Sequence, residues 1–377
     1  MKKLLFILGF GFFIPLLVIS NTSLDADPPQ VYIEVPDEVP ADTPFNLTLS
    51  ASEPVTYTIK YAGLELTEVA QNYTLSLLAA EGLQTLEVSA MDGSKNQSSY
   101  SYEVYGIATL KASMSLSESV VAGSPTSIKV AWPADGLQPS SVAVYVNGVL
   151  EPLYQKGNEA IALAGIPLGS PSQTVPVQAV LADSYGRTVT LNKQLTVVAD
   201  EREVENLNLT ETTYSVVTAE AQEREREALD GAYQSARTRP LPLWREPFVI
   251  PIEGRMTSGY GTPRRYISGG NVSFHTGADI AAPQGTPIRA SNDGVVLISN
   301  FYPIKGGLTV IDHGASVFSF YFHQSKFLVQ VGDTVKRGQI IGEVGTTGLS
   351  TGPHLHWEMQ INGVPTNPLD WVDKLLP

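Results

Sequence analysis

The histidines of this chain are concentrated in one stretch. All five of them lie in the last third, at His275, His313, His323, His354 and His356, and the first 274 residues contain none. Imidazole is a common metal ligand and titrates near neutral pH, so this clustering predicts a site of metal or acid–base chemistry. The chain has no cysteine, which excludes disulfides, thiolate zinc sites and a cysteine nucleophile. Any metal must therefore be held by histidine and carboxylate side chains.

One candidate motif is His275-Thr276-Gly277-Ala278-Asp279, which offers an imidazole and a carboxylate four residues apart. Surrounding glycine and proline residues disfavour a helix here. In an extended chain the two side chains would stand about 13 Å apart, whereas zinc ligands lie only about 2.0–2.2 Å from the ion. The segment must therefore bend sharply if both side chains bind one ion, and Gly277 permits such a bend.

A second motif, His354-Leu355-His356-Trp357, alternates in the manner of a strand with both histidines on one face. One imidazole can bind a metal while the other reaches a water bound to that metal. His323 ends an aromatic strand, Phe318–His323. Each signal alone fits a structural role at least as well. Together, two histidines and one aspartate make a three-ligand site with an open fourth position, as in catalytic zinc sites, and two histidines remain for proton transfer and a developing oxyanion.

The elements upstream of these motifs are predicted to be strands. From about residue 28 to residue 198, short runs such as Val31–Val35, Phe45–Leu49 and Tyr57–Tyr61 alternate apolar and polar residues, which is typical of half-buried strands. Asn147-Gly148 directly after such a run indicates a type I′ hairpin. The pattern recurs at an offset of roughly 80–90 residues, which suits two tandem seven-stranded sandwiches. Both halves resemble bacterial immunoglobulin-like modules.

Two other segments differ from the rest in composition. Lys2 and Lys3 precede an apolar run, Leu4–Ile19, which is typical of a secretory signal or a membrane anchor, and both readings stay open. Residues 200–247 form a connector in which Thr218 is expected to cap a helix over 219–236, followed by a proline-rich stretch. This charged helix is more consistent with a solvated surface than with a docking site.

Five stretches of the last third resemble the lysostaphin/LytM-type zinc metallopeptidases, which cut peptide bonds in bacterial peptidoglycan. They are Thr257–Gly261, His275–Pro283, Val310–Gly314, Tyr321–His323 and Gly352–Glu358. The resemblance covers residues 248–371 only. Glycines punctuate short strands there, so we expect a compact antiparallel β-domain with a groove.

The resemblance implies a role for each matching residue. His275, Asp279 and His356 match the family's zinc ligands, so one Zn²⁺ is the expected cofactor. His323 and His354 match its two catalytic imidazoles, one acting as general base and the other binding the oxyanion, with the order left open. His313 matches no ligand and is expected to be structural. The family usually has leucine where this chain has Gln324, which leaves the local packing there open.

The sequence therefore predicts a mainly β protein of five segments: a signal peptide or anchor (1–27), two sandwich modules (28–107 and 108–199), a connector (200–247) and a zinc metallopeptidase domain (248–377). The expected function is exported hydrolysis of peptidoglycan peptides in the periplasm, in the cell wall or at the outer face of the cytoplasmic membrane. Two alternatives are a non-hydrolytic activator of other wall hydrolases and a zinc carboxypeptidase of stem peptides. Envelope proteins are expected partners of the modules. The formal net charge of −14 excludes nucleic acid as the main partner.

Overall fold

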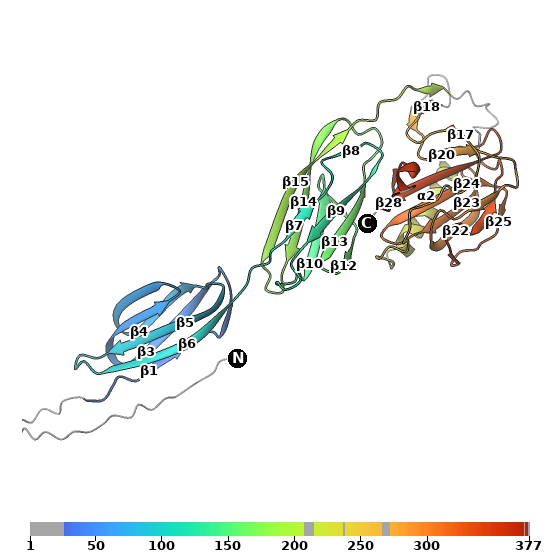
Figure 1. The fold of residues 1–377 in the computed structure, drawn as a ribbon. Coiled ribbons are helices and arrows are strands. Elements are labelled where there is room, and N and C mark those ends of the chain that lie inside the picture. The colour runs from blue at the N-terminus through green and yellow to red at the C-terminus, as the bar shows by residue number, and fades with distance from the viewer. Residues whose placement is uncertain (1–25, 207–214, 237, 266–271, 373, 376–377) are drawn as a thin grey trace, which may run out of the picture. The chain divides into compact units, whose positions relative to one another are not determined.

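The structure is a computed structural model, and it describes residues 26–206, 215–236, 238–265, 272–372 and 374–375. The predicted signal peptide or anchor lies almost wholly outside the described residues. Within the described ranges no helix is long and apolar enough to cross a membrane. The chain divides into two compact units, residues 1–111 with 135–137 and residues 112–134 with 138–377. Each unit consists mainly of β-strands, as predicted (Figure 1).

The first module is a six-stranded sheet of order β1-β3-β5-β6-β2, with β4 paired along β3. Its long strand β3 pairs with β1 through its first half and with β5 through its second half. The register of its pairing with β4 shifts between Ser50 and Val55. The sheet encloses one apolar core. The strands are β1 (Val31–Glu34), β2 (Glu38–Pro40), β3 (Pro44–Tyr61), β4 (Leu64–Leu78), β5 (Gly82–Met91) and β6 (Gln97–Ile107).

The second module has two sheets, of order β11-β10-β14-β15-β8 and β12-β13-β9-β7. Asn147 and Gly148 have φ values of 50° and 79° and join β10 to β11, so the predicted hairpin is present. The modules contain six and nine strands among the described residues, so the expectation of seven in each is wrong. The strands are β7 (Ser113–Ser115), β8 (Ser119–Val121), β9 (Pro125–Ala131), β10 (Ser141–Val146), β11 (Val149–Glu151), β12 (Leu153–Lys156), β13 (Glu159–Gly165), β14 (Gln173–Ala182) and β15 (Thr188–Val198).

The connector contains the helix α2 (Ala219–Ala236), which begins where the capping residue predicts. The Oγ1 atom of Thr218 accepts a hydrogen bond from the backbone N–H of Ala221 at 3.1 Å. One face packs on apolar side chains of β22–β24, so the prediction of a solvated helix is wrong for that face. The outer face is charged, and there Arg226 pairs with Glu223 and Asp230.

The C-terminal domain is built on an eight-stranded sheet of order β17-β20-β28-β24-β23-β22-β26, with β29 beside β28. Its named pairings are antiparallel, as expected. The side chains of Leu355, Trp357, Met359 and Ile361 point from one face of β28 into the core and are fully buried. The strands are β17 (Arg255–Ser258), β20 (Ala278–Ala281), β22 (Gly294–Tyr302), β23 (Gly306–Asp312), β24 (Val317–Gln324), β26 (Thr334–Val335), β28 (His354–Ile361) and β29 (Val364–Thr366).

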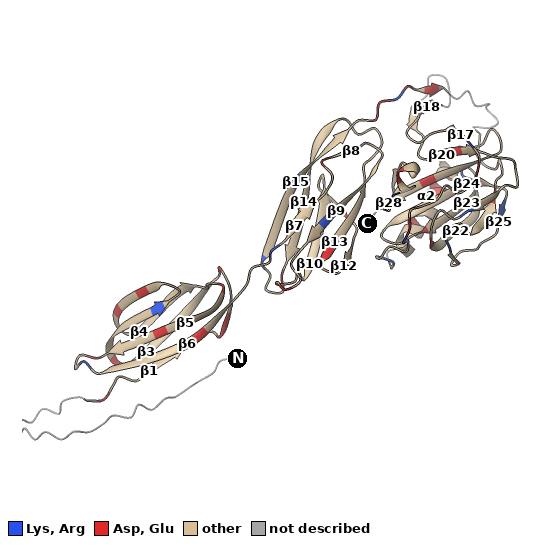
Figure 2. Ribbon diagram, viewed as in Figure 1, with Lys and Arg blue, Asp and Glu red and all other residues tan. Residues whose placement is uncertain are grey.

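Short elements complete this part of the chain. One three-stranded sheet has the order β21-β27-β25, and another has the order β16-β18-β19. Acidic residues occur on strands of the modules and of the C-terminal domain, with fewer basic residues among them (Figure 2). The remaining elements are β16 (Glu205–Asn206), β18 (Pro263–Arg265), β19 (Ser273–Phe274), β21 (Pro287–Arg289), β25 (Lys326–Phe327), β27 (Ile340–Glu343) and the 3₁₀ helix η1 (Pro368–Trp371).

Candidate functional site

Three of the predicted site residues meet on two neighbouring strands. Asp279 on β20 lies directly opposite His356 on β28, and His275 precedes β20. The Nε2 atom of His275 lies 3.0 Å from Oδ1 of Asp279 and 3.0 Å from Nδ1 of His356, and the latter two atoms are 2.9 Å apart. Three atoms this close can all lie at about 2.0–2.2 Å from one zinc ion. The three residues therefore form a candidate metal site.

The bend predicted at His275–Asp279 is present, but Gly277 serves a different purpose from the one expected. Its φ is not in the left-handed region. A Cβ atom at Gly277 would instead lie 2.6 Å from Nε2 of His356 and 2.6 Å from the carbonyl oxygen of Trp357. Glycine is therefore required because β28 approaches the backbone closely.

The loop at Thr257–Gly261 fixes the orientation of His275. The Nδ1 atom of His275 lies 2.8 Å from the carbonyl oxygen of Gly259, and its backbone carbonyl accepts from Gly261 N–H at 2.8 Å. With the Nδ1 proton donated to Gly259, the lone pair is on Nε2, which is the atom facing Asp279. The Thr257–Gly261 motif therefore serves to orient His275.

Glu358, to which no role was assigned from the sequence, orients His356. It contacts Nε2 of that ring, whereas Gly259 contacts Nδ1 of His275. The Nε2 atom of His356 lies 3.3 Å from Oε2 of Glu358, so in the neutral ring Nδ1 carries the lone pair toward Asp279. Glu358 is itself held by Thr276, whose hydroxyl donates at 2.6 Å, and by the side-chain amide of Gln360. The signal for Glu358 was present, because the alternation that places His354 and His356 on one face continues to Glu358 and Gln360.

The electrostatics of this cluster favour a bound cation. Burial alone would raise the pKa of Asp279, but its close contacts with the imidazoles of His275 and His356 hold that pKa well below its usual range. Burial opposes protonation of His356, yet Asp279 and Glu358 together raise its pKa to about 9. Two carboxylates therefore stabilise positive charge at this point, and the donor set of two imidazoles and a carboxylate is one that Zn²⁺ accepts.

Arg264 on β18 is a second residue that the sequence analysis missed. Its guanidinium lies 2.7 Å from Oδ2 of Asp279, and its side chain is 10% exposed. The pairing leaves Oδ1 of Asp279 directed toward the two histidines. Nothing in the spacing of Arg264 from the motif predicts this contact, because it depends on the pairing of β18 with β19.

His323 and His354 face the same groove as the three candidate ligands. Their ring centroids lie 4.6 Å apart, and Nε2 of His354 is 3.9 Å from Oδ1 of Asp279. Each Nδ1 atom lies 2.8 Å from a backbone carbonyl, of Thr347 for His323 and of Gly352 for His354. Both rings are thereby held with Nδ1 protonated, so each has its lone pair on Nε2.

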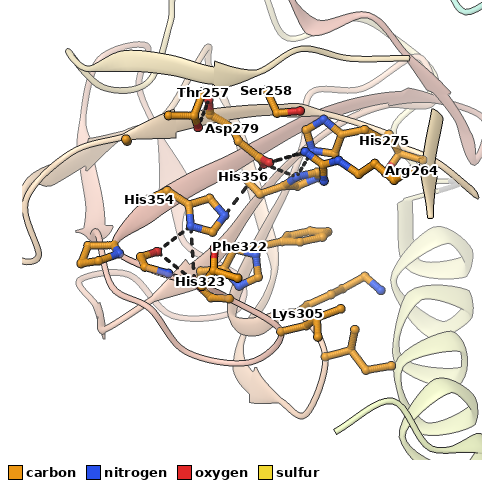
Figure 3. Close-up of a pocket in the computed structure, with 18 of the residues that line it drawn as sticks. Thr257, Ser258, Arg264, His275, Asp279, Lys305, Phe322, His323, His354 and His356 are labelled. Carbon is orange, nitrogen blue, oxygen red and sulfur yellow. Dashed lines mark hydrogen bonds and ion pairs between the residues drawn. The ribbon is translucent and has the colours of Figure 1, made fainter. Parts of the chain in front are cut away.

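The groove has a volume of about 440 Å³. The candidate ligands and Arg264 lie at one end, and Lys305 and Phe322 lie beside His323 (Figure 3). The polar loop 349–353 forms part of its wall. The structure thus brings all five predicted site residues to one open cavity.

His313 lies away from this groove and is fully buried. Its ring nitrogens lie 2.7 Å from the carbonyl oxygen of Asp293 and 2.7 Å from the hydroxyl of Ser319, and its ring packs edge-on against Phe248. These contacts are what a structural histidine makes. Burial lowers its pKa from 6.5 to about 4.

This lowered pKa predicts a pH dependence of stability. Below pH 6.5 the unfolded chain binds a proton at His313 before the folded chain does, so stability is complete above that pH and is lost as the pH falls toward 4. The expected loss between neutral pH and pH ~5 is about 2 kcal/mol. Unfolding midpoints of the wild type and His313→Asn over this range would measure it. The variant should be less stable at neutral pH but less sensitive to acid, and parallel curves would contradict the assignment.

Gln324, at the position where the resemblance led us to expect leucine, is accommodated in the core. It is fully buried, and its amide nitrogen donates to Oγ1 of Thr309 at 2.8 Å and to the carbonyl oxygen of Tyr321 at 3.0 Å. The buried glutamine therefore makes polar contacts at a position where the resemblance led us to expect an apolar side chain.

Comparison with known proteins gives matches to this part of the chain. A model of peptidase family M23 matches residues 273–368. Peptidoglycan DD-endopeptidase ShyA of Vibrio cholerae is 38% identical over 140 residues, which are 37% of this chain and 33% of that protein. DD-carboxypeptidase/endopeptidase Mpg of Neisseria meningitidis is 50% identical over 96 residues, which are 26% of this chain and 22% of that protein. The chain thus spans a third or less of these relatives.

A solved structure is also similar in sequence. The catalytic domain of lysostaphin from Staphylococcus simulans is 32% identical, and the match covers 32% of this chain and 93% of that one, with a TM-score of 0.30.

Proposed function

We propose that the protein is a zinc-dependent endopeptidase that hydrolyses peptide cross-links of bacterial peptidoglycan outside the cytoplasmic membrane, and the match of residues 273–368 to a model of peptidase family M23 supports this. One observation carries the proposal. Three ligand atoms lie within 3.0 Å of one another, beside two further imidazoles whose Nε2 atoms face the same groove. Relatives named as peptidoglycan DD-endopeptidases support the choice of substrate.

In this proposal His275, Asp279 and His356 hold one Zn²⁺. The ion, when bound, supplies Lewis acidity, which lowers the pKa of water to about 7 and polarises the scissile carbonyl. Asp279 contributes the negative charge that strengthens cation binding. Gly259 and Glu358 fix the two imidazoles so that a lone pair of each faces the ion.

His323 and His354 manage the protons. A neutral imidazole with Nδ1–H bound to a carbonyl can only accept at Nε2, so one of the two rings takes the proton of the attacking water. Burial lowers the pKa of His323 to about 3, which keeps this ring neutral at physiological pH. Once protonated, a ring can stabilise the oxyanion or protonate the leaving amine.

The test is to incubate the zinc-loaded full chain with defined cross-linked muropeptide dimers and identify the products by mass spectrometry. We expect conversion of dimers to monomers, loss of activity with a chelator and recovery on adding Zn²⁺. Release of only a terminal D-alanine would favour a carboxypeptidase, the second candidate, which the name of the Neisseria relative supports. A zinc-bound chain that yields no product would instead favour a non-hydrolytic activator.

We also propose that the modules at 28–107 and 108–199 place the enzymatic domain within the envelope and bind envelope proteins or the wall. Support comes from their lack of histidine, because the proposed hydrolysis depends on histidines that all lie in the last third of the chain. Binding of the full chain and of a chain lacking residues 28–107 to isolated cell walls would test this. Equal binding by both would argue against a role for the first module.

A further inference from the structure

Helix α2 precedes residues 273–368, the part of the chain that the family model matches, yet it packs on the sheet that carries the site. Ala232 and Ala236 lie in one apolar cluster with side chains of β22, β23 and β24, and Ala228, Leu229 and Tyr233 pack against it. Two polar side chains of the helix, Glu225 and Tyr233, also point toward the sheet and make specific contacts there.

The carboxylate of Glu225 is 3% exposed and holds the turn between β22 and β23. Its Oε1 atom accepts from the backbone N–H groups of Ile304 at 2.7 Å and Lys305 at 3.1 Å. Its Oε2 atom lies 2.9 Å from Nζ of Lys305. Burying a carboxylate is unfavourable unless it is fully paired, and packing alone would be served better by an apolar residue. The burial of a carboxylate at position 225 therefore indicates that the turn between β22 and β23 must be held in a fixed position.

The turn in question supports His323. The carbonyl oxygen of Lys305 accepts from the backbone N–H of His323 at 3.0 Å, and that of Ile304 accepts from Leu349 N–H at 2.8 Å. Leu349 belongs to the loop in which the carbonyl of Thr347 receives the Nδ1 proton of His323. His323 has a φ of 61°, a left-handed conformation that non-glycine residues seldom adopt and that surrounding contacts must maintain.

Tyr233 connects the same helix to the metal site. Its hydroxyl donates to Oε1 of Gln360, and the amide of Gln360 donates to Oε1 of Glu358. The other oxygen of Glu358 lies 3.3 Å from Nε2 of His356. A chain of hydrogen bonds thus runs from α2 to the imidazole that presents Nδ1 to the ion.

We propose that α2 helps to position the catalytic and metal-binding histidines: Glu225 positions His323, and Tyr233 positions His356. The proposal rests on the function proposed above. It assigns a role to residues outside the matched family domain, in a segment expected from its sequence to be a connector. Both are positioning residues, since neither touches the groove cavity.

The first test compares Glu225→Ala, Glu225→Gln and Glu227→Ala in the full chain. Glu227 is exposed two residues further along the same helix and serves as the matched control. With zinc bound, we expect Glu225→Ala to lower kcat about 10- to 100-fold with little change in KM, because His323 is displaced. Glu225→Gln retains an acceptor for the two backbone N–H groups and should recover much of the loss, whereas Glu227→Ala should match the wild type.

A second measurement does not depend on turnover. Hydrogen exchange of the peptides covering 303–306 and 346–349 should become faster in Glu225→Ala and stay unchanged in Glu227→Ala. Tyr233→Phe keeps the ring contact with Phe318 and removes only the hydroxyl, so we expect the zinc dissociation constant to rise about tenfold in competition with a chelator.

These outcomes separate the two proposals. Unchanged exchange, unchanged kcat and unchanged zinc affinity in the helix variants would overturn the role of α2. A wild-type chain that binds zinc but cleaves no muropeptide would overturn the proposed function, while the exchange and zinc measurements would still decide whether α2 positions the site.

Discussion

Replacement of His356 by alanine is expected to abolish zinc binding and to lower peptidoglycan hydrolysis by more than about a thousandfold. The change removes one of three ligand atoms, leaving Nε2 of His275 and Oδ1 of Asp279, which lie 3.0 Å apart. It also leaves Glu358, which is buried and paired with His356, without its imidazole partner. Zinc content after gel filtration and the rate of muropeptide cleavage would be measured on the same preparation.

A matched control is Gln330→Ala, which truncates an exposed side chain of similar size in the same domain and should keep both zinc and activity. Because His356→Ala removes a buried side chain, thermal unfolding of the variant must be recorded as well. Asp279→Asn offers a second route to the same conclusion, since it keeps the side-chain shape while removing the charge. Wild-type zinc stoichiometry in a folded His356→Ala protein would show that the ligand set is wrong.

The part of this site that sequence could predict is the part that depends on local geometry. Alternation within His354–Gln360 places alternate side chains on one face whatever the rest of the chain does, and the structure has His354 and His356 on the same face. Resemblance to a peptidase family supplied the ligand set. The pairing of Asp279 with His356 is different, because it depends on the register of two strands whose contacting residues are 77 positions apart.

Contacts that orient the histidines could be predicted only in part. Glu358 continues the alternation of β28 and could have been assigned, since a ligating imidazole usually donates its other N–H to a carboxylate or carbonyl. Arg264 could not, because its contact with Asp279 is set by tertiary packing. Likewise, the motif itself does not predict that β28 approaches the backbone at Gly277 so closely that only glycine fits there.

The helix α2 shows why a charged composition is an unreliable guide to burial. Its bounds followed from the Thr218 cap, but its charge suggested solvent exposure. Ala228, Ala232 and Ala236 recur every four residues, and this spacing is the signal of a packed face. The burial of Glu225 depends on a turn about 80 residues further along the chain, so no local pattern predicts it.

In the first module, the alternating runs around Leu47 and Ile59 did predict strands with apolar residues facing inward. What they did not predict is that both runs belong to one strand, β3. The sequence between them contains Pro54, which normally interrupts a ladder. The structure accommodates it at the register shift between Ser50 and Val55, so β3 continues past the irregularity.

Replacement of His354 by alanine is expected to separate catalysis from metal binding. The three candidate ligands are untouched, so zinc content should equal that of the wild type. The variant loses an imidazole whose Nε2 lies 3.9 Å from Oδ1 of Asp279 and whose Nδ1 is held by Gly352. Because positioned acid–base groups contribute about 100- to 10,000-fold, kcat should fall by that factor with little change in KM.

Two features make this variant informative. His354 is partly exposed at the groove, with 16% of its side chain accessible, so its removal should disturb the fold less than removal of His356. It also lies on the same strand as His356, two residues away, so the two alanine variants compare neighbouring imidazoles assigned different roles. If His354→Ala loses zinc as His356→Ala does, the imidazole at 354 is a ligand, and the division of the site into three ligands and two proton carriers is wrong.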